Sequence, residues 1–246
     1  MLTRAELAAI LSAHTDTLKL KMRTKTLVMT AAAMVAGVLA SSAQVYSANV
    51  VGYINITLTP GYNLMCNQLN NGNNSLNVAL TNGAVDGLQI QALVGGAFDS
   101  ADQYYQGYGW YQGDGVTPST RQLVPGVGYL INNQFTTNVT LTLVGDVPQT
   151  TITTSIAAGN GFYGSPFPVV SGFSTNGFPG VDGMQYSTFT GYPTPVYSGA
   201  DQYYAGFGWY GPDGVTPADP SPAVGRGFLI YNQSSATNWV MSFTVK

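Results

Sequence analysis

The chain has 246 residues, 45% of them hydrophobic, which is enough apolar material for one large or two small globular domains. Only 8% are charged, against roughly 25% in an average soluble protein, and this composition excludes intrinsic disorder. Beyond residue 43, three basic residues stand against nine aspartates, a net charge of −6. A chain so short of cations is unsuited to a nucleic-acid backbone or to anionic lipid, so neither is expected as a partner.

Residues 1–43 read as a leader that contains a secretory signal peptide. Lys19–Lys25 is positively charged, Thr26–Ala40 is an apolar run of 15 residues, and Ser41–Ala43 offers small side chains for cleavage. The apolar run is shorter than the ~20 residues that span a bilayer, so no stable membrane span is expected after cleavage near Ala43. An uncleaved N-terminal anchor is the alternative. Met22 is a more ordinary start, which indicates that the first 21 residues come from a wrongly chosen start codon. The expected location is secreted, periplasmic or at the cell surface.

Short strand patterns separated by turn signals follow the leader. Tyr53–Thr59 alternates apolar and polar residues, which is typical of a half-buried strand, and it ends at the Pro60-Gly61 turn. Tyr62–Leu69 predicts a second strand, and Ser75–Leu80 predicts one or two helical turns. Further strands are expected over Leu88–Val94, within Phe98–Tyr111, over Val127–Asn132 and over Asn138–Val144.

The second half of the chain repeats the first. Ala101–Pro118 and Ala200–Pro217 lie 99 residues apart and are identical at 14 of 18 positions. The strand patterns recur in the same order, from Thr151–Ile156 to Trp239–Val245. We therefore predict an all-β fold of two tandem homologous antiparallel β-sandwich or small-barrel repeats, 44–146 and 147–246, with little helix. One fused β-structure with internal pseudo-twofold symmetry is the alternative.

The start of the mature chain, QVYSANVVGYINITLTPGYNLMCNQL from Gln44, carries a group of motifs. With the Gly126–Ile131 and Gly225–Ile230 strands, it resembles a numerous group of small secreted proteins from verrucomicrobial-type bacteria. That group has a QVYS-x-N-x-VGY start and two G-x-G[FY] strands. The resemblance covers the whole mature chain and implies a secreted double-repeat β-protein, but it implies no activity. The second copy departs from the strand pattern over Gly159–Tyr163.

Several residue types that carry chemistry are missing from the expected mature chain. His14 and Glu6 lie in the leader, and beyond it Lys246 is the single lysine. This removes Ser-His-Asp and Cys-His nucleophilic systems, His-ligated zinc and Schiff-base lysines. Cys66 is the single cysteine, so no intramolecular disulfide can form, and a buried, inert thiol is expected. We therefore expect no catalytic residue, cofactor or metal, although a pair of aspartates could still support a glycosidase-type reaction.

Two Asp-Gly pairs, at Asp114 and Asp213, lie at the same place in the duplicated block. Aspartate and glycine together favour tight turns. The functional alternative is a Ca²⁺ site in which Asp102 and Asp114, and Asp201 and Asp213 in the second copy, supply oxygen ligands. Calcium takes six to eight oxygens, and no D-x-D-x-D-G loop is present, so the turn interpretation is preferred.

The aromatic residues of the block allow two interpretations. They can form core and strand faces, where large rings stabilise sheets. Because adjacent tyrosines point to opposite faces of a strand, one ring could instead be exposed and stack on a sugar. The candidate ligand-binding residues are Asp102, Gln103, Tyr104, Tyr105, Trp110 and Asp114 in the first copy, and Asp201, Gln202, Tyr203, Tyr204, Trp209 and Asp213 in the second.

Three functional hypotheses follow. The first is an exported, non-enzymatic structural or adhesive protein of the cell surface or matrix, with glycans or other surface proteins as partners. The second is a carbohydrate-binding module with one aromatic site per repeat, which burial of both Trp110 and Trp209 would weaken. The third is an aspartate-dependent glycan hydrolase, which needs two carboxylates about 5–10 Å apart across a cleft.

Overall fold

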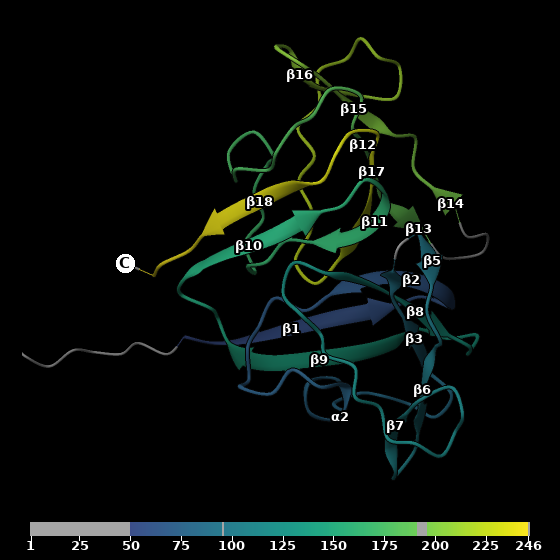
Figure 1. Ribbon diagram of the computed structural model, residues 1–246. Coiled ribbons are helices and arrows are strands. Elements are labelled where there is room, and N and C mark those ends of the chain that lie inside the picture. The colour runs from purple at the N-terminus through teal and green to yellow at the C-terminus, as the bar shows by residue number, and fades with distance from the viewer. Residues whose placement is uncertain (1–49, 95, 191–195, 246) are drawn as a thin grey trace, which may run out of the picture. The chain divides into compact units, whose positions relative to one another are not determined.

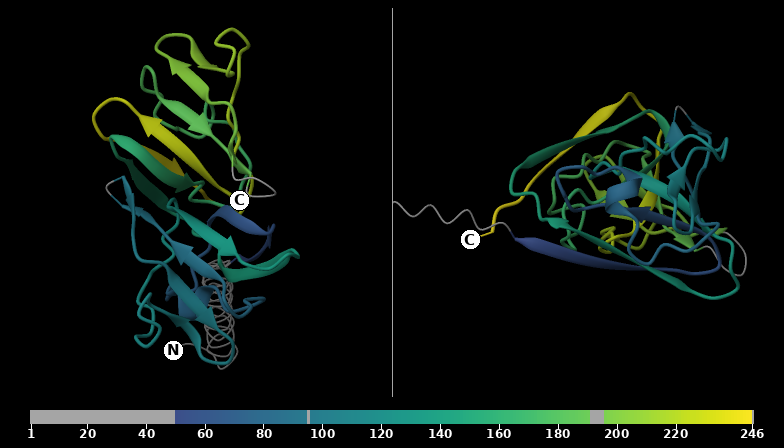
Figure 2. Two further views of the ribbon diagram at one scale, coloured as in Figure 1. Left: turned by 90° about the vertical axis from the view of Figure 1, so that its right-hand side faces the viewer. Right: turned by 90° about the horizontal axis from the view of Figure 1, so that it is seen from below.

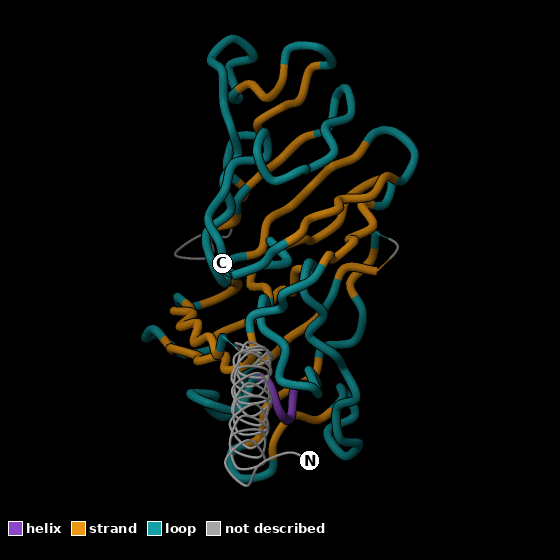
Figure 3. Tube along the Cα trace, turned by 90° about the vertical axis from the view of Figure 1, so that its left-hand side faces the viewer, coloured by secondary structure: helices purple, strands orange, loops and turns teal. Residues whose placement is uncertain are grey.

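The computed structural model describes residues 50–94, 96–190 and 196–245. The expected signal peptide lies outside these residues. The regular secondary structure of the described chain is nearly all strand, joined by loops and turns, with one short helix (Figure 3), as the strand and turn patterns predict. No helix in the described ranges is long and apolar enough to cross a membrane.

Within its described residues, the first repeat contains nine strands and the helix. Their bounds are β1 Val51–Leu58, β2 Gly61–Cys66, α2 Leu76–Ala79, β3 Gln89–Gln91, β4 Leu93–Val94, β5 Ala97–Phe98, β6 Asp102–Tyr105, β7 Gly109–Tyr111, β8 Gly128–Asn133 and β9 Val139–Asp146. The helix falls inside the segment predicted to be helical.

The part of the second repeat that the structure describes contains nine strands in the same order. Their bounds are β10 Thr151–Ile156, β11 Gly159–Gly164, β12 Gln185–Ser187, β13 Phe189–Thr190, β14 Val196–Tyr197, β15 Asp201–Tyr204, β16 Gly208–Tyr210, β17 Gly227–Asn232 and β18 Thr237–Ser242. Figure 2 shows the first repeat in purple to teal and the second in green to yellow.

Both repeats have the same sheet topology. Each holds a five-stranded antiparallel sheet, in the order β2-β8-β3-β6-β7 in the first repeat and β11-β17-β12-β15-β16 in the second (Figure 1). Each also has a two-stranded ribbon, β1-β9 or β10-β18, and a short hairpin, β4-β5 or β13-β14. The duplication in sequence is therefore a duplication of the whole fold.

Each ribbon packs its apolar face on the inner face of its sheet. In β1, the buried side chains of Ile54, Ile56 and Leu58 alternate with exposed ones, because successive side chains of a strand point to opposite faces. They join one core cluster with Ile90 and Ile131 of the sheet. The result is a two-layer sandwich in each repeat, which is the predicted fold class.

Backbone hydrogen bonds join the two repeats in a pseudo-symmetric way. The Cys66 N–H donates to the Gly225 carbonyl at 3.1 Å, and the equivalent Gly164 N–H donates to the Gly126 carbonyl at 3.1 Å. A Cβ added to Gly128, the first residue of β8, would lie 2.8 Å from the backbone nitrogen of Tyr163. Glycine at that position therefore permits the close approach. The two tandem repeats thus meet at a junction where equivalent backbone groups form equivalent hydrogen bonds.

Cys66 lies where the pseudo-twofold relation brings equivalent positions together. A Cβ added to Gly164, its counterpart, would overlap the Cys66 side chain. The thiol is fully buried, and burial raises its pKa to about 12. The prediction of a buried cysteine is confirmed, and the high pKa keeps the thiol protonated and unreactive at neutral pH.

Candidate functional site

The duplicated block folds into a hairpin at the outer edge of each five-stranded sheet. In the first repeat, β6 pairs with β7 so that Tyr104 faces Trp110 and Gln103 faces Tyr111. The second repeat has the same register in β15 and β16. The connecting turn has Gly107 at φ 82° and Gly109 at φ 101°, a backbone region that glycine enters without strain. The outer strands β7 and β16 stand away from the junction (Figure 1).

The inner face of this hairpin belongs to the core. Trp110 is 0% exposed and Trp209 is 6% exposed. Trp110 packs against Tyr104 with ring centroids 5.4 Å apart, and Trp209 packs against the half-buried Tyr203 at 5.5 Å. The Trp110 indole N–H donates to the Leu80 carbonyl at 2.7 Å. The burial of both tryptophans weakens the sugar-platform interpretation for the inner-face rings, because a buried ring cannot stack on a ligand.

The outer face of the hairpin carries the candidate rings that remain partly open. Tyr105 packs edge-on against Tyr111 at 5.7 Å, and Tyr204 packs the same way against Tyr210 at 5.6 Å. Tyr111 and Tyr210 were not among the candidates chosen from the sequence. The register adds them, because they lie directly opposite Gln103 and Gln202.

Among the residues that the structure describes, the most exposed rings lie at the turn of each hairpin. Tyr108 is 80% exposed and its counterpart Phe207 is 79% exposed. Val116 and Val215, in the following loop, are also exposed. We call these two surfaces the tips: Tyr105, Tyr108, Tyr111 and Val116 form tip 1, and Tyr204, Phe207, Tyr210 and Val215 form tip 2. Sequence reasoning did not select Tyr108 or Phe207, although an aromatic residue between two turn glycines was a signal for exposure.

Tip 2 encloses a shallow hollow of about 370 Å³. Its lining consists of Tyr204, Phe207, Tyr210, Gly214 and Val215. No charged side chain lines it, so it suits an uncharged group with flat or apolar faces.

Asp114 and Asp213 hold the loop beside each tip. Asp114 accepts hydrogen bonds from the Val116 and Thr117 N–H groups at 3.0 and 2.9 Å and from the Thr117 hydroxyl at 2.6 Å. Asp213 makes the equivalent three bonds. The side-chain bond from Thr216, followed by the backbone bonds, lowers the pKa of Asp213 to about 2. Both aspartates therefore act as turn formers.

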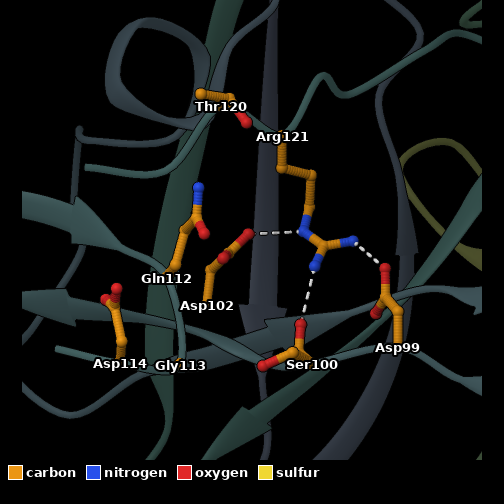
Figure 4. Close-up of a pocket in the computed structure, with 8 residues that line it drawn as sticks. All are labelled: Asp99, Ser100, Asp102, Gln112, Gly113, Asp114, Thr120 and Arg121. Carbon is orange, nitrogen blue, oxygen red and sulfur yellow. Dashed lines mark hydrogen bonds and ion pairs between the residues drawn. The ribbon is translucent and has the colours of Figure 1, made fainter. Parts of the chain in front are cut away.

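Asp102 lies on the inner face of β6 and forms an ion pair with Arg121. Arg121 also pairs with Asp99, and we call these three residues the clasp. The Arg121 Nε donates to Asp102 at 2.6 Å, and another guanidinium nitrogen donates to Asp99 at 2.6 Å (Figure 4). The Ser119 hydroxyl also donates to Asp102. Burial lowers the pKa of Arg121, but the bonds to both carboxylates outweigh it, and the pKa lies above its ordinary value. Sequence reasoning selected Asp102 but missed Arg121, the residue that neutralises it.

A polar hollow of about 540 Å³ lies beside this clasp. Asp99, Asp102, Asp114 and Arg121 all line it (Figure 4). Their charged groups are occupied by one another or by the loop. Among the described residues no group of three or more His, Cys, Asp or Glu side chains could hold a metal ion.

The second repeat has no counterpart of the clasp. Pro220 stands at the position of Arg121, and Ser198 at the position of Asp99. Asp201, the counterpart of Asp102, is half-buried without an ion pair in the described chain, and burial raises its pKa. The clasp is therefore a feature of one repeat, whereas the tips occur in both.

The two candidate glutamines lie on the outer face, within a row that crosses all five strands. Cross-strand pairing aligns Tyr62, Asn132, Gln89, Gln103 and Tyr111 in the first repeat. The same pairing aligns Asn160, Tyr231, Gln185, Gln202 and Tyr210 in the second. We call each set an outer row, and each row ends at the tyrosine at the base of a tip.

Comparison with known proteins gives no family. No family model matches the chain, and neither a curated protein nor a solved structure matches it.

Proposed function

We propose that this chain is an exported, non-enzymatic adhesive protein that bridges two surfaces through its tips. The observation that carries the proposal is the paired exposure of Tyr108 and Phe207, each about four-fifths open to solvent at equivalent turns. Rings so exposed contribute little to the core of either sandwich. Exposed apolar clusters are typical of interaction surfaces, and one on each repeat gives the chain two points of attachment.

The carboxylates support a non-enzymatic role. Asp99 and Asp102 share Arg121, while Asp114 and Asp213 stabilise turns. A glycosidase needs one carboxyl group free to give a proton and another free to attack or to activate water. These four aspartates, committed to structural bonds, do not meet that need.

Two attachment points also suit the rigid junction. A rigid link holds two sites at a fixed separation, so one tip can attach to one surface while the other tip attaches to a second. The backbone bonds at Cys66 and Gly164 fix one repeat against the other. Bridging is therefore expected to depend on both tips, and simple attachment on either one.

The proposal is tested with beads coated with the purified chain and mixed with bacterial envelope and matrix material. We expect the wild-type chain to retain beads and to cross-link particles. Tyr108→Ser or Phe207→Ser alone should preserve retention but reduce cross-linking at least tenfold, and the double variant should lose both.

Tyr53→Ser serves as the matched control, because Tyr53 is an exposed ring on β1, far in sequence and topology from the tip hairpins. It should leave adhesion unchanged. Adhesion that survives the double variant, or that falls equally in the control, would contradict the proposal. Tip variants should also unfold at the wild-type urea concentration, because surface substitutions usually change stability by less than about 0.5 kcal/mol.

A further inference from the structure

The outer rows have a composition that the core does not require. Each row consists of two tyrosine rings and three side-chain amides over five adjacent strands. Tyr62 and Tyr231 are exposed, and the glutamines and Tyr111 and Tyr210 are half-buried. On the opposite face of the same strands, Ile90 and Ile131 lie in the core. The row is thus the solvent side of a sheet whose other side is fully packed.

The junction sets one limit of this open surface. Two residues along β2 and β8 from the row, Leu64 and Leu130 are buried in a cluster with Phe162 of the second repeat. Apolar residues therefore occupy the part of the outer face that the other repeat covers, and polar residues occupy the part that it leaves open. This division indicates that the open part is adapted to contact water or a polar ligand.

The amides of the first row are partly oriented in advance. The Gln89 Nε2 donates to the Gln103 Oε1 at 3.1 Å. A primary amide has two N–H donors and an acceptor oxygen with two lone pairs, so both side chains keep further capacity for hydrogen bonds. Amides held in this way lose less conformational entropy when they bind a ligand.

The dimensions of a row favour an extended ligand. Adjacent strands lie about 4.8 Å apart, so five strands span about 19 Å from the first side chain to the last. Rings can stack on the apolar faces of sugar rings, and amides can exchange hydrogen bonds with their hydroxyls. A chain of several sugar units would meet ring, amide, amide, amide and ring along the first row. Along the second row it would meet amide, ring, amide, amide and ring.

Charge decides the kind of polysaccharide. Neither row contains an ionisable acid or base other than tyrosine. The chain beyond residue 43 carries a net charge of −6, and Arg121 is neutralised by two carboxylates. An acidic polysaccharide would be repelled, whereas a neutral one meets a surface of matching polarity.

We infer that each outer row binds an extended neutral polysaccharide, with the sugar chain lying across the five strands and ending against the tyrosine at the base of the tip. The inference rests on the proposed adhesive function and names the class of ligand that the repeats bind. It assigns binding to Gln89, Gln103, Gln185 and Gln202, of which Gln89 and Gln185 were not selected from the sequence.

The test uses the full chain and a panel of neutral glycans: cellulose, chitin, mannan, starch and a β-1,3-glucan. Retention in affinity gels and calorimetry with matching oligosaccharides measure the binding. We expect at least one glycan to bind, with hexasaccharides at least tenfold tighter than disaccharides, because a short ligand covers only part of the row. Gln103→Ala with Gln202→Ala should weaken binding about fivefold to tenfold at each row, since each lost hydrogen bond is worth about 1 kcal/mol.

The matched control is Thr57→Ala with Thr140→Ala, an exposed cross-strand pair on the first ribbon. It should leave binding unchanged. The inference is overturned if no panel glycan binds, or if the glutamine variant binds as tightly as the control. Failure of the adhesive function is a separate result: wild-type beads would then not adhere at all. Adhesion that soluble glycans do not inhibit would support the adhesive function and contradict the assignment of glycan binding to the outer rows.

Discussion

The two repeats share one topology but stabilise it with different chemistry. In the first repeat, Arg121 clasps Asp99 and Asp102 beneath the tip hairpin. In the second, Pro220 and Ser198 replace Arg121 and Asp99, and Asp201 remains without an ion pair among the described residues. Because the same fold forms with and without the clasp, the clasp is not what specifies the topology.

The cores differ in a similar way. The first core is mainly aliphatic and includes Leu76, from the short helix α2. The second core is mainly aromatic, and Phe173 and Phe178 stack with ring centroids 3.9 Å apart. Trp239 of β18 joins that stack at 5.0 Å from Phe178. Volume and shape, rather than residue identity, therefore hold each sandwich together.

What the repeats keep in common lies at two places: the junction and the tip. The equivalent hydrogen bonds of Cys66 and Gly164 keep the junction symmetric. Asp114 and Asp213 accept equivalent hydrogen bonds, at equal distances, from the backbone of their loops. Features retained while the cores diverged are the ones to which we assign assembly and binding.

The largest effect is expected from removal of the clasp. Arg121→Leu leaves the buried carboxylate of Asp102, whose side chain is 6% exposed, without its cation. Loss of one partner of a buried pair costs about 3–5 kcal/mol, which urea unfolding should detect as a lower midpoint with an unchanged slope.

Arg226→Leu is the control for this variant, because Arg226 donates a hydrogen bond to the Thr57 carbonyl and has no ion pair in the described residues. It should cost only about 1 kcal/mol. A second substitution, Asp102→Asn, should recover most of the stability lost in Arg121→Leu. Equal losses in the two arginine variants would show that the clasp does not stabilise the first repeat more than an ordinary hydrogen bond.

The next effect concerns the place where the repeats meet. Gly164→Ala puts a methyl group into the space that the Cys66 side chain fills. Overpacking of this kind costs about 1–3 kcal/mol. Thermal unfolding should show the loss, and the compensating double substitution Cys66→Gly with Gly164→Ala, which removes the side chain that the new methyl group meets, should recover much of it. If the double variant is no more stable than Gly164→Ala alone, the two positions do not pack against each other at the junction.

Much of the fold follows from local pattern. The alternation in Tyr53–Thr59 predicts β1, and the duplicated block predicts two copies of one topology. Whether the two copies form separate domains or one fused β-structure could be stated as alternatives from the sequence but not decided from it. The reason is that the bond between Cys66 and Gly225 joins residues 225 − 66 = 159 positions apart, and the bond between Gly126 and Gly164 joins residues 164 − 126 = 38 positions apart. No local sequence pattern reports contacts at these separations.

The candidate site was less predictable. Alternation shows that Tyr104 and Tyr105 point to opposite faces, but not which face meets the core. The structure buries Tyr104 and leaves Tyr105 partly open. The pairing of Asp102 with Arg121 depends on how a loop returns over β6. No sequence pattern around either residue predicts this ion pair. The exposure of Tyr108 could be predicted from its flanking glycines. The outer row through Gln103 could be identified only from the register of five strands, which the sequence does not specify.

The smallest effect separates the two equivalent aspartates. Burial raises the pKa of Asp201, so the folded chain holds its proton more tightly than the unfolded chain. The contribution of this group to the free energy of unfolding therefore rises as the pH falls through its folded pKa. At pH 7 its charged form slightly destabilises the folded chain. Asp201→Asn should raise the melting temperature slightly at pH 7, and the difference should vanish below about pH 3, where both states are protonated. Asp102→Asn should instead lower the melting temperature at pH 7, because it weakens the clasp with Arg121. The same substitution should thus have opposite signs in the two repeats, and matching signs would mean that the arginine makes no difference to the aspartate beside it.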